Sequence, residues 1–314
     1  MTDSDSGGEP QGSETKCGFV AVIGAPNAGK STLVNSLVGA KVSIVSPRVQ
    51  TTRSIVRGIA IFGASQVIFA DTPGIFQPKK RLERAMVAAA WSGAADAEVI
   101  LLVVDSSKAG KHADADADTD RIIADIKKSG RKALLALNKV DITDKGRLLD
   151  LTARLNASDV FDEIFMISAL TGDGLAHLRD HLAGLMSPGP WLFPEDEISD
   201  MPARLLAAEI TREKLFLNLR QELPYSCAVE TERWEEKKDG SARIEQVIYV
   251  SRETHRPIVL GNGGQRLKTI GASSRLELEA LLERRVHLFL HVKVNERWNE
   301  DRALYAAWGL DFNA

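Results

Sequence analysis

The segment GAPNAGKS, residues 24–31, fits the pattern G-x-x-x-x-G-K-[ST] and lies between an apolar run, CGFVAVIG, and a helix-like stretch, TLVNSLVG. Glycines in such a loop let backbone N–H groups converge on phosphate oxygens at a helix N-terminus, where the helix dipole also favours anions. Lys30 is placed to reach the β and γ phosphates, and the Ser31 hydroxyl to bind Mg²⁺. The pattern predicts a nucleotide-binding loop made of Gly24, Ala25, Pro26, Asn27, Ala28, Gly29, Lys30, Ser31 and Thr32.

A second motif, NKVD at residues 138–141, ends an apolar run and indicates which base is bound. The Asp141 carboxylate can accept both donors of the guanine N1–H and N2–H₂ edge, whereas adenine would leave it unpaired. The tripeptide SAL follows the last apolar run of this half and can close over the base. We assign guanine binding to Asn138, Lys139, Val140, Asp141, Ser168, Ala169 and Leu170.

The motif DTPG, residues 71–74, also ends an apolar run. Asp71 is expected to hold Mg²⁺ through water, and the Gly74 N–H to bond the γ-phosphate. A threonine in the preceding loop, SPRVQTTRS, would complete the Mg²⁺ shell only when a γ-phosphate is present, which makes that loop a switch. We expect this threonine to be Thr52, with Thr51 the close rival. Further nucleotide contacts are assigned to Asp71, Thr72, Pro73, Gly74 and Ile75, and catalysis to Lys30, Thr52 and Gly74.

These motifs follow short apolar runs that alternate with segments of helical length. Such alternation predicts a mostly parallel sheet covered on both faces, with ligands at the carboxyl ends of the strands. The pattern stops at a stretch with four prolines, SPGPWLFPEDEISDMP, which indicates a linker. The chain therefore divides into a polar, disordered tail (1–16), an α/β nucleotide-binding domain (17–186), a linker (187–202) and an α+β domain (203–314).

A second glycine loop, GNGG at residues 261–264, precedes a basic segment, QRLKTIG. The residues leave three readings open: a second nucleotide site, a plain helix-entry turn, or an RNA clamp. No Lys-Ser/Thr pair follows in register, which argues against a nucleotide site. The predicted order around the loop is α-β-β-α-α-β, and a G-x-x-G loop joining two helices in this order resembles a KH domain of type II. That resemblance implies a loop that clamps about four single-stranded nucleotides.

The KH resemblance places RNA contacts on the loop and its flanks. Apolar residues before the loop would form the floor of a groove, with Ile270 packed behind it. KH loops commonly carry Lys or Arg between the glycines, and here Arg266 would supply that charge from the helix start. No acidic residue lies between Glu253 and Glu277, although residues 205–314 carry 17 basic and 17 acidic residues. The expected RNA-binding residues are Ile258, Val259, Leu260, Gly261, Asn262, Gly263, Gly264, Arg266, Lys268 and Arg275.

The composition is that of a globular protein, with 314 residues, 44% hydrophobic, 26% charged and a formal net charge of −3. No apolar run approaches the roughly 18 residues that span a bilayer. The two cysteines, Cys17 and Cys227, lie far apart, which suits a reducing compartment. We expect a cytoplasmic protein without a DNA partner, and leave peripheral membrane contact open.

The nucleotide motifs resemble a GTPase of the translation-factor-related class, and GAPNAGKST with QTTR is similar to its Era-type branch. Ras-like GTPases place a water-orienting Gln directly after D-x-x-G, whereas Ile75 follows here. Relatives with an asparagine at the position of Asn27 use it to hold K⁺ beside the phosphates. The resemblance therefore implies Mg²⁺, with Asn27 as a K⁺ ligand that offsets transition-state charge.

With both halves considered, everything after residue 16 resembles the Era family, bacterial GTPases with a C-terminal KH domain; FPEDEISD, AAEITREKLF and ELPYS carry the resemblance between the loops. It implies binding of GTP and GDP, binding of the 3′ end of 16S rRNA, a role in 30S ribosomal subunit assembly, and loose contact with the inner face of the cell membrane. The alternative is the GTPase module of an RNA- or tRNA-modifying system. We also hypothesise that residues 50–53 and Gly74 control domain docking, which would expose or mask the GNGG groove.

Overall fold

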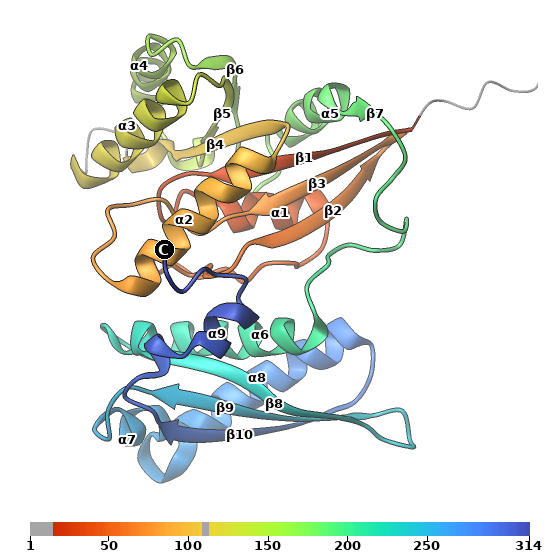
Figure 1. Cartoon of the computed structure of the whole chain (residues 1–314), viewed down its shortest axis with the longest axis vertical. Coiled ribbons are helices and arrows are strands. Elements are labelled where there is room, and N and C mark those ends of the chain that lie inside the picture. The colour runs from red at the N-terminus through yellow and green to blue at the C-terminus, as the bar shows by residue number, and fades with distance from the viewer. Residues whose placement is uncertain (1–14, 109–112) are drawn as a thin grey trace, which may run out of the picture.

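Two β-sheets organise the chain, one in each half of the molecule (Figure 1). The structure is a computed structural model that describes residues 15–108 and 113–314. In Figure 1 the larger sheet and its helices lie above the smaller sheet, and an extended segment joins the two halves. We call these halves the N-terminal and C-terminal domains.

The larger sheet is mostly parallel, as the sequence predicts. Its strands lie in the order β2-β3-β1-β4-β5-β6, and the short β7 pairs with β1. β2 and β7 run antiparallel to their neighbours, while the other pairings are parallel. The strands are β1 (Lys16–Ile23), β2 (Val56–Phe62), β3 (Ser65–Asp71), β4 (Val99–Asp105), β5 (Ala133–Asn138), β6 (Phe161–Met166) and β7 (Ser187–Pro188).

Helices cover both faces of this sheet, which explains why its central strands are apolar along their whole length. One core forms between the sheet and helices α1 and α5, and a second forms between the sheet and α2, α3 and α4. The loops after β1, β3, β4 and β5 therefore meet at the carboxyl edge of the parallel strands. The helices are α1 (Lys30–Val38), α2 (Arg81–Asp96), α3 (Ala113–Lys128), α4 (Lys145–Asn156) and α5 (Leu175–Leu185).

The N-terminal end of the domain differs from the predicted boundary. Lys16, assigned to the disordered tail, is the first residue of β1. Thr15 precedes it, and its hydroxyl donates to the Gly189 carbonyl at 2.9 Å. The rest of the predicted tail, residues 1–14, lies outside the described residues.

The proline-rich linker is attached to the sheet along part of its length. Ser187 and Pro188, assigned to the linker, form β7 beside β1. The Gln66 side chain, at the start of β3, accepts hydrogen bonds from the N–H groups of Leu192 and Phe193. The first part of the linker is therefore held by the backbone of β1 and by one side chain of β3.

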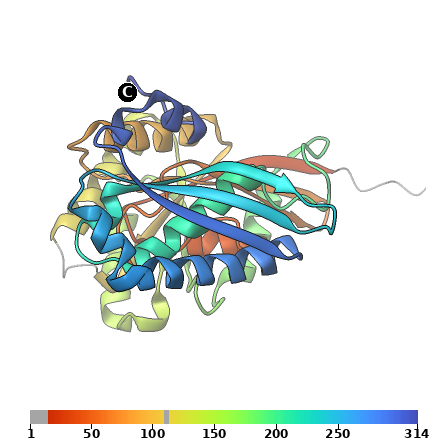
Figure 2. The same ribbon diagram turned by 90° about the horizontal axis from the view of Figure 1, so that it is seen from below.

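The C-terminal domain has the predicted order α-β-β-α-α-β (Figure 2). Strand β8 is antiparallel to β9, and β10 is parallel to it, in the order β10-β9-β8. Helices α6 and α8 pack on one face of this sheet. No helix in the described ranges is long and apolar enough to cross a bilayer. The elements are α6 (Ala203–Asn218), β8 (Cys227–Glu236), β9 (Ala242–Val250), α7 (His255–Leu260), α8 (Gln265–Leu282) and β10 (Val286–Val294).

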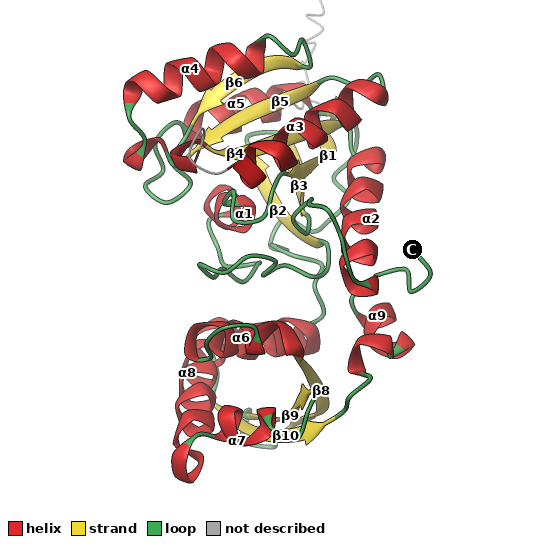
Figure 3. Cartoon of the chain, turned by 90° about the vertical axis from the view of Figure 1, so that its left-hand side faces the viewer, coloured by secondary structure: helices red, strands yellow, loops and turns green. Residues whose placement is uncertain are grey.

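The last residues of the chain return to the N-terminal domain. A short turn (Trp298–Glu300) and helix α9 (Arg302–Ala307) follow β10 and pack against α2, and the C-terminus lies beside that helix (Figure 3). Tyr305 and Trp308 join the buried cluster that includes Met86 of α2. The sequence did not predict this contact, which fixes one domain against the other.

Candidate functional sites

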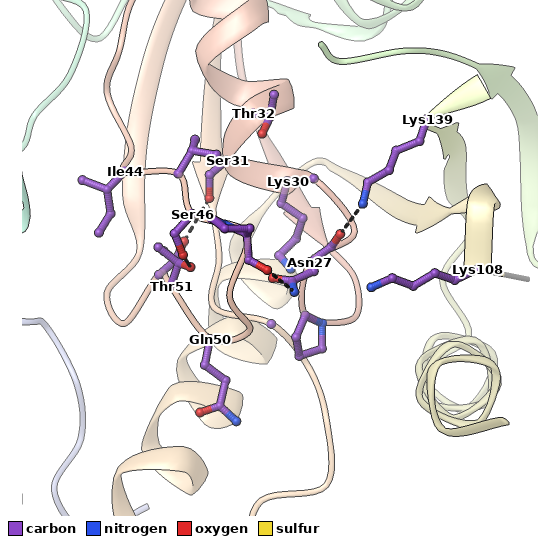
Figure 4. A pocket seen from close by; sticks show the side chains of 16 residues that line it. Asn27, Lys30, Ser31, Thr32, Ile44, Ser46, Gln50, Thr51, Lys108 and Lys139 are labelled. Atoms are coloured by element: carbon purple, nitrogen blue, oxygen red, sulfur yellow. Dashed lines mark hydrogen bonds between the residues drawn. The ribbon is translucent and has the colours of Figure 1, made fainter. Parts of the chain in front are cut away.

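The phosphate loop lines a cavity of about 360 Å³ at the carboxyl edge of the large sheet (Figure 4). Lys30, the first residue of α1, points into the loop, and its Nζ donates to the carbonyls of Gly24 and Ala25, each at 3.0 Å. Burial lowers the pKa of Lys30 to about 8, although the nearby Asp71 carboxylate opposes the shift. A desolvated ammonium held only by carbonyls is suited to an anionic ligand, and the loop before α1 is open to one.

Glycine is required at position 29, where the loop enters α1. Its φ is +97°, and a Cβ there would lie 2.2 Å from Nδ2 of Asn138. Gly74 is also tightly placed, since a Cβ there would lie 2.9 Å from Cγ of Pro26. The phosphate loop is therefore packed directly against both the NKVD and the DTPG segments.

A metal site is indicated by the side chains around Asp71. This residue is 0% exposed, and neither of its carboxylate oxygens is hydrogen-bonded to a described residue. Burial raises its pKa, whereas the Ser31, Ser43 and Thr52 hydroxyls and the Lys30 ammonium act in the opposite direction. A buried carboxylate without a partner is costly, and a cation would remove that cost.

The structure distinguishes the two candidate switch threonines. The Thr52 Oγ1 lies 2.9 Å from the Ser31 Oγ, so both hydroxyls face the same point beside Asp71. The Thr51 hydroxyl instead bonds to the Ser46 hydroxyl at 2.6 Å and to the Arg48 carbonyl at 3.0 Å. Oxygen ligands from Ser31 and Thr52, with Asp71 behind them, fit the preference of Mg²⁺ for hard oxygen donors. The geometry therefore favours Thr52.

Asn138 joins three of the predicted motifs. Its Nδ2 donates to the Ala28 carbonyl at 2.8 Å, and its Oδ1 accepts from the N–H of Ala169 at 2.9 Å. Lys139 has a positive φ of 68°, and its Nζ donates to the Asn27 carbonyl at 3.0 Å (Figure 4). Asp141 is exposed at the same edge. The base-reading carboxylate is thus left open to a ligand while its neighbours fix the loop.

Two residues assigned to nucleotide binding direct their side chains elsewhere. The Thr72 hydroxyl is buried and donates to the Val22 carbonyl at 2.8 Å. Ile75 is 2% exposed and packs in the core, while its N–H donates to the Gly24 carbonyl at 3.0 Å. Neither side chain is therefore open to a nucleotide, and the Ile75 side chain has no access to an attacking water.

Lys108 also lines the nucleotide cavity and was not among the predicted site residues (Figure 4). It lies in the turn after β4, where its Nζ is 3.7 Å from the Asp105 carboxylate. Its place one turn beyond the carboxyl end of a parallel strand is the signal that would have found it.

In the second candidate site, the GNGG loop joins α7 to α8. Gly261 has a φ of +73°, and a Cβ there would lie 2.7 Å from the Arg266 Cβ. The Arg266 Nη1 donates to the Ile258 carbonyl, which closes the C-terminal end of α7. Lys268 is exposed, whereas Arg275 pairs with Glu279 at 3.3 Å. Beside the loop, the Lys268 ammonium is open to solvent, while the Arg266 and Arg275 guanidinium groups already contact other residues of the chain.

Five of the ten predicted RNA residues line two cavities. Ile258 and Arg266 line one of about 620 Å³, together with Arg220 and His255. Gly264, Lys268 and Arg275 line another of about 510 Å³ between α8 and β10. The sequence did not identify the apolar lining of this second cavity, since it comes from a different strand and from the inner turns of α8: Leu267, Gly271, Ala272, Leu288, Phe289 and Leu290.

One residue that the sequence predicted to line the RNA groove is buried in the core instead. Val259 is 0% exposed and belongs to the core under α6 and the sheet, together with Ile270. The segment before the loop is helix α7, so successive residues point in different directions, and only Ile258 of the apolar run is well exposed, at 47%. Val259 therefore stabilises the domain and cannot touch a ligand.

These sites define a P-loop GTPase with an attached RNA-binding domain. Residues 19–139 match the family described as 50S ribosome-binding GTPase, and residues 222–299 match the KH domain family. The GTPase Era of Rhizobium meliloti (strain 1021) is 54% identical over 312 residues, covering 99% of this chain and 98% of the relative. That of Brucella suis biovar 1 (strain 1330) is 55% identical over 309 residues, covering 98% of each. The chain belongs to the Era family of GTPases.

Solved Era structures share the arrangement of both domains. Era in complex with MgGDPNP and nucleotides 1506–1542 of 16S ribosomal RNA has a TM-score of 0.87 and 39% identity. A variant of Aquifex aeolicus Era bound to GDP·AlF4⁻ has a TM-score of 0.86 and 40% identity. Each comparison covers 94% of this chain and 99% of the other. The family and the fold class inferred from the motifs are thus confirmed.

Proposed function

We propose that this protein hydrolyses GTP with Mg²⁺ bound at Ser31, Thr52 and, through water, Asp71, and that its KH domain binds the 3′ end of 16S rRNA during assembly of the 30S subunit. The observation that carries the catalytic part is the buried Asp71 carboxylate, which has no hydrogen-bond partner and lies beside the paired hydroxyls of Ser31 and Thr52. The RNA part is supported by the KH match and by the relative solved with 16S RNA.

Each part of the nucleotide site has a separate task in this proposal. Lys30 leaves its two carbonyl acceptors and neutralises the β and γ phosphates. The Gly74 N–H, at the end of DTPG, bonds the γ-phosphate. Bound Mg²⁺ supplies charge stabilisation to the transferring phosphoryl group. Asp141 selects guanine, because its carboxylate pairs with both edge donors of that base.

Asn27 is proposed to hold K⁺ beside the phosphates. Its Nδ2 donates to the Pro47 carbonyl at 3.2 Å, so the amide nitrogen faces that loop and the Oδ1, the atom that would bind K⁺, does not. The test compares GTP turnover in KCl and in NaCl at equal ionic strength, with wild type and Asn27→Ala. Faster turnover in KCl, lost in the variant, supports the proposal, and equal rates in both salts would refute it.

For the RNA site, we propose that bases occupy the cavity between α8 and β10 while the backbone passes over the GNGG loop. The cavity is apolar at its floor and has Lys268 at its rim, a combination that suits stacked bases and linking phosphates. Crosslinking in cells, comparing wild type with Gly263→Asp, tests the loop and identifies the RNA together. Loss of a 16S 3′-end crosslink in the variant supports the proposal; an unchanged crosslink, or one to a different RNA, refutes it.

Coupling between the two sites is the remaining part of the proposal. The switch residues 50–53 would change the docking of the domains with the nucleotide, and docking would expose or mask the RNA groove. RNA affinity measured with a GTP analogue and with GDP tests this part. Equal affinities would remove it while leaving the two separate activities in place.

Association with the inner face of the cell membrane, which the family resemblance implies, stays a prediction. Against the rival role in an RNA-modifying system, Cys227 is excluded as a nucleophile. Burial raises the pKa of the Cys227 thiol to about 12, and the Cys17 thiol donates to the Gln66 side chain at 3.6 Å. A thiol with such a raised pKa is not a nucleophile near neutral pH.

A further inference from the structure

The segment between α1 and β2 (residues 41–53), which contains most of the proposed switch loop, lies against α6 of the C-terminal domain (Figures 1 and 3). At its start the Lys41 Nζ is 2.7 Å from the Glu213 carboxylate, and the other oxygen of that carboxylate accepts from the Val45 N–H at 2.8 Å. In its middle the Arg48 Nε donates to the Phe216 carbonyl at 2.7 Å, near the end of α6. The segment is therefore held by the RNA-binding domain along much of its length.

Arg212 of α6 holds the residue directly before Thr52. Its side chain is 1% exposed, and its Nη2 donates to the main-chain carbonyl of Thr51 at 2.5 Å. Glu209, one turn earlier on α6, accepts from both Nε and Nη2 and fixes the plane of the guanidinium. A charged, fully desolvated donor of this kind is geometrically specific and costly to displace.

Arg53 is the residue directly after Thr52, and its own side chain is anchored in the C-terminal domain. It is 4% exposed, and its Nη1 donates to the Cys227 carbonyl at 3.0 Å. Its guanidinium lies 5.2 Å from the ring of Trp298 and 5.5 Å from that of Trp308, within the range of cation–π attraction. All three of these partners belong to the C-terminal domain, so Thr52 is bracketed by two anchors from the same domain.

The contacts of Arg212 and Arg53 on either side of Thr52 affect the position of the Thr52 hydroxyl, which contacts the Ser31 hydroxyl. A threonine side chain has one rotatable bond to its oxygen and few allowed rotamers, so the backbone at Thr52 determines where Oγ1 lies. The anchors act on the adjoining peptides, and Oγ1 is 2.9 Å from the Ser31 Oγ. Displacements near 1 Å at a metal and phosphate site cost large factors in rate.

We infer that Arg212 is a positioning residue for GTP hydrolysis: from the RNA-binding domain, it holds the Thr51 carbonyl so that Thr52 faces Ser31 and Asp71 and completes the Mg²⁺ site. This inference rests on the proposed role of Thr52 as a Mg²⁺ ligand. It makes the KH domain a structural part of the catalytic site and not only the means of RNA binding.

The test uses the full-length protein and the variant Arg212→Met, which keeps the length and removes the donors. We expect kcat for GTP to fall at least 10-fold and the Mg²⁺ concentration for half-maximal turnover to rise at least 5-fold. The affinity for GDP should stay within 2-fold of wild type, since the phosphate loop and NKVD are untouched. Arg212→Lys, which can still donate to the Thr51 carbonyl, should restore part of kcat.

Two further variants separate positioning from folding. Arg204→Met removes a cation from the same helix, where the Arg204 Nη2 donates to the Glu232 carbonyl within the C-terminal domain, and should leave kcat and the Mg²⁺ dependence unchanged. Glu209→Gln combined with Arg212→Met avoids leaving a buried carboxylate unpaired, and should repeat the loss of kcat with a higher melting temperature than Arg212→Met alone.

Either of two outcomes would overturn the inference: wild-type kcat and Mg²⁺ dependence in Arg212→Met, or an equal loss of GDP affinity and kcat, which would indicate a general defect of the nucleotide site. Wild-type protein that fails to hydrolyse GTP would refute the proposed function itself. The two failures are therefore told apart by the wild-type control.

Discussion

The two glycine loops of this chain differ in how tightly they are surrounded. In the first, a Cβ on Gly29 would lie 2.2 Å from the Asn138 side chain, and the loop is packed between the NKVD and DTPG segments. In the second, only Gly261 is crowded, with a Cβ position 2.7 Å from the Arg266 Cβ, whereas Gly263 and Gly264 have positive φ but no heavy atom within 4 Å of their Cβ positions. A packed loop suits one compact triphosphate, whereas an open loop suits a strand that enters and leaves. The packing around each loop, more than its glycines, therefore distinguishes the proposed nucleotide site from the proposed RNA-binding loop.

The largest effect is expected from Gly29→Ala, which adds a methyl group to the packed loop. Both the positive φ and the overlap with Asn138 oppose it, and we expect nucleotide affinity to fall about 1,000-fold, or about 4 kcal/mol. Titration with a fluorescent GDP measures it. Gly39→Ala is the matched control, because its φ is +78° at the other end of α1 and nothing lies within 4 Å. If both variants lost affinity equally, backbone strain and not packing would explain the loss.

Asp71→Asn is expected to lower GTP turnover about 100-fold, a loss of about 3 kcal/mol, because the charge behind the Mg²⁺ site disappears. The same change removes a buried carboxylate without a hydrogen-bond partner, but it also removes the counter-charge of the buried Lys30 ammonium, so the free energy of unfolding of the nucleotide-free variant should stay within about 1 kcal/mol of wild type. Steady-state turnover and thermal unfolding measure the two quantities. A variant that lost several kcal/mol of stability would show that Asp71 supports the fold instead of the metal site.

Gly263→Asp tests the open loop, where we expect RNA affinity to fall about 10-fold as the carboxylate repels phosphates and the positive φ becomes strained. GTP turnover should stay within about 2-fold, since the loop makes no contact with the first site. Gly263→Asn is the control, because asparagine has the same shape and tolerates this φ without a charge. Equal losses in the two variants would assign the effect to shape.

The smallest difference is expected between two cations beside the loop. Lys268→Ala should weaken RNA binding about 4-fold and lower the salt slope by about 0.7, the value for one phosphate contact on a single strand. Arg275→Ala should cost only about 2-fold, because Arg275 is already paired with Glu279. Binding measured between 50 and 200 mM salt compares them. A larger loss for Arg275 would mean that its ion pair opens on binding.

Much of both sites was predictable because it depends on local patterns. GAPNAGKS, DTPG and NKVD each end an apolar strand, and parallel strands bring their carboxyl ends to one edge wherever the helices pack. The order α-β-β-α-α-β likewise follows from short segments of clear periodicity. Lys108 was missed because the turn after β4 has no motif, although its position at that edge is the same kind of signal.

Other residues could not be placed from local patterns. Thr51 and Thr52 are adjacent and of one type, and the contact with Ser31 singles out Thr52. Val259 lies between two residues that reach the surface, and the helical turn of α7 sends it into the core. The groove between α8 and β10 joins residues 264–275 to residues 288–290, and it forms where the helix packs across the strand.

The sequence by itself determined that this chain has a phosphate-loop motif, and it predicted a guanine-reading NKVD loop and a KH-type GNGG loop, because each of these needs particular residues at short, fixed spacing. Only the tertiary structure decided how the domains meet: that the C-terminal segment packs on α2, and that Arg212 and Arg53 bracket Thr52 from either side. Such contacts join residues more than 150 positions apart. They depend on the packing of whole surfaces, for which no short stretch of sequence carries a signal.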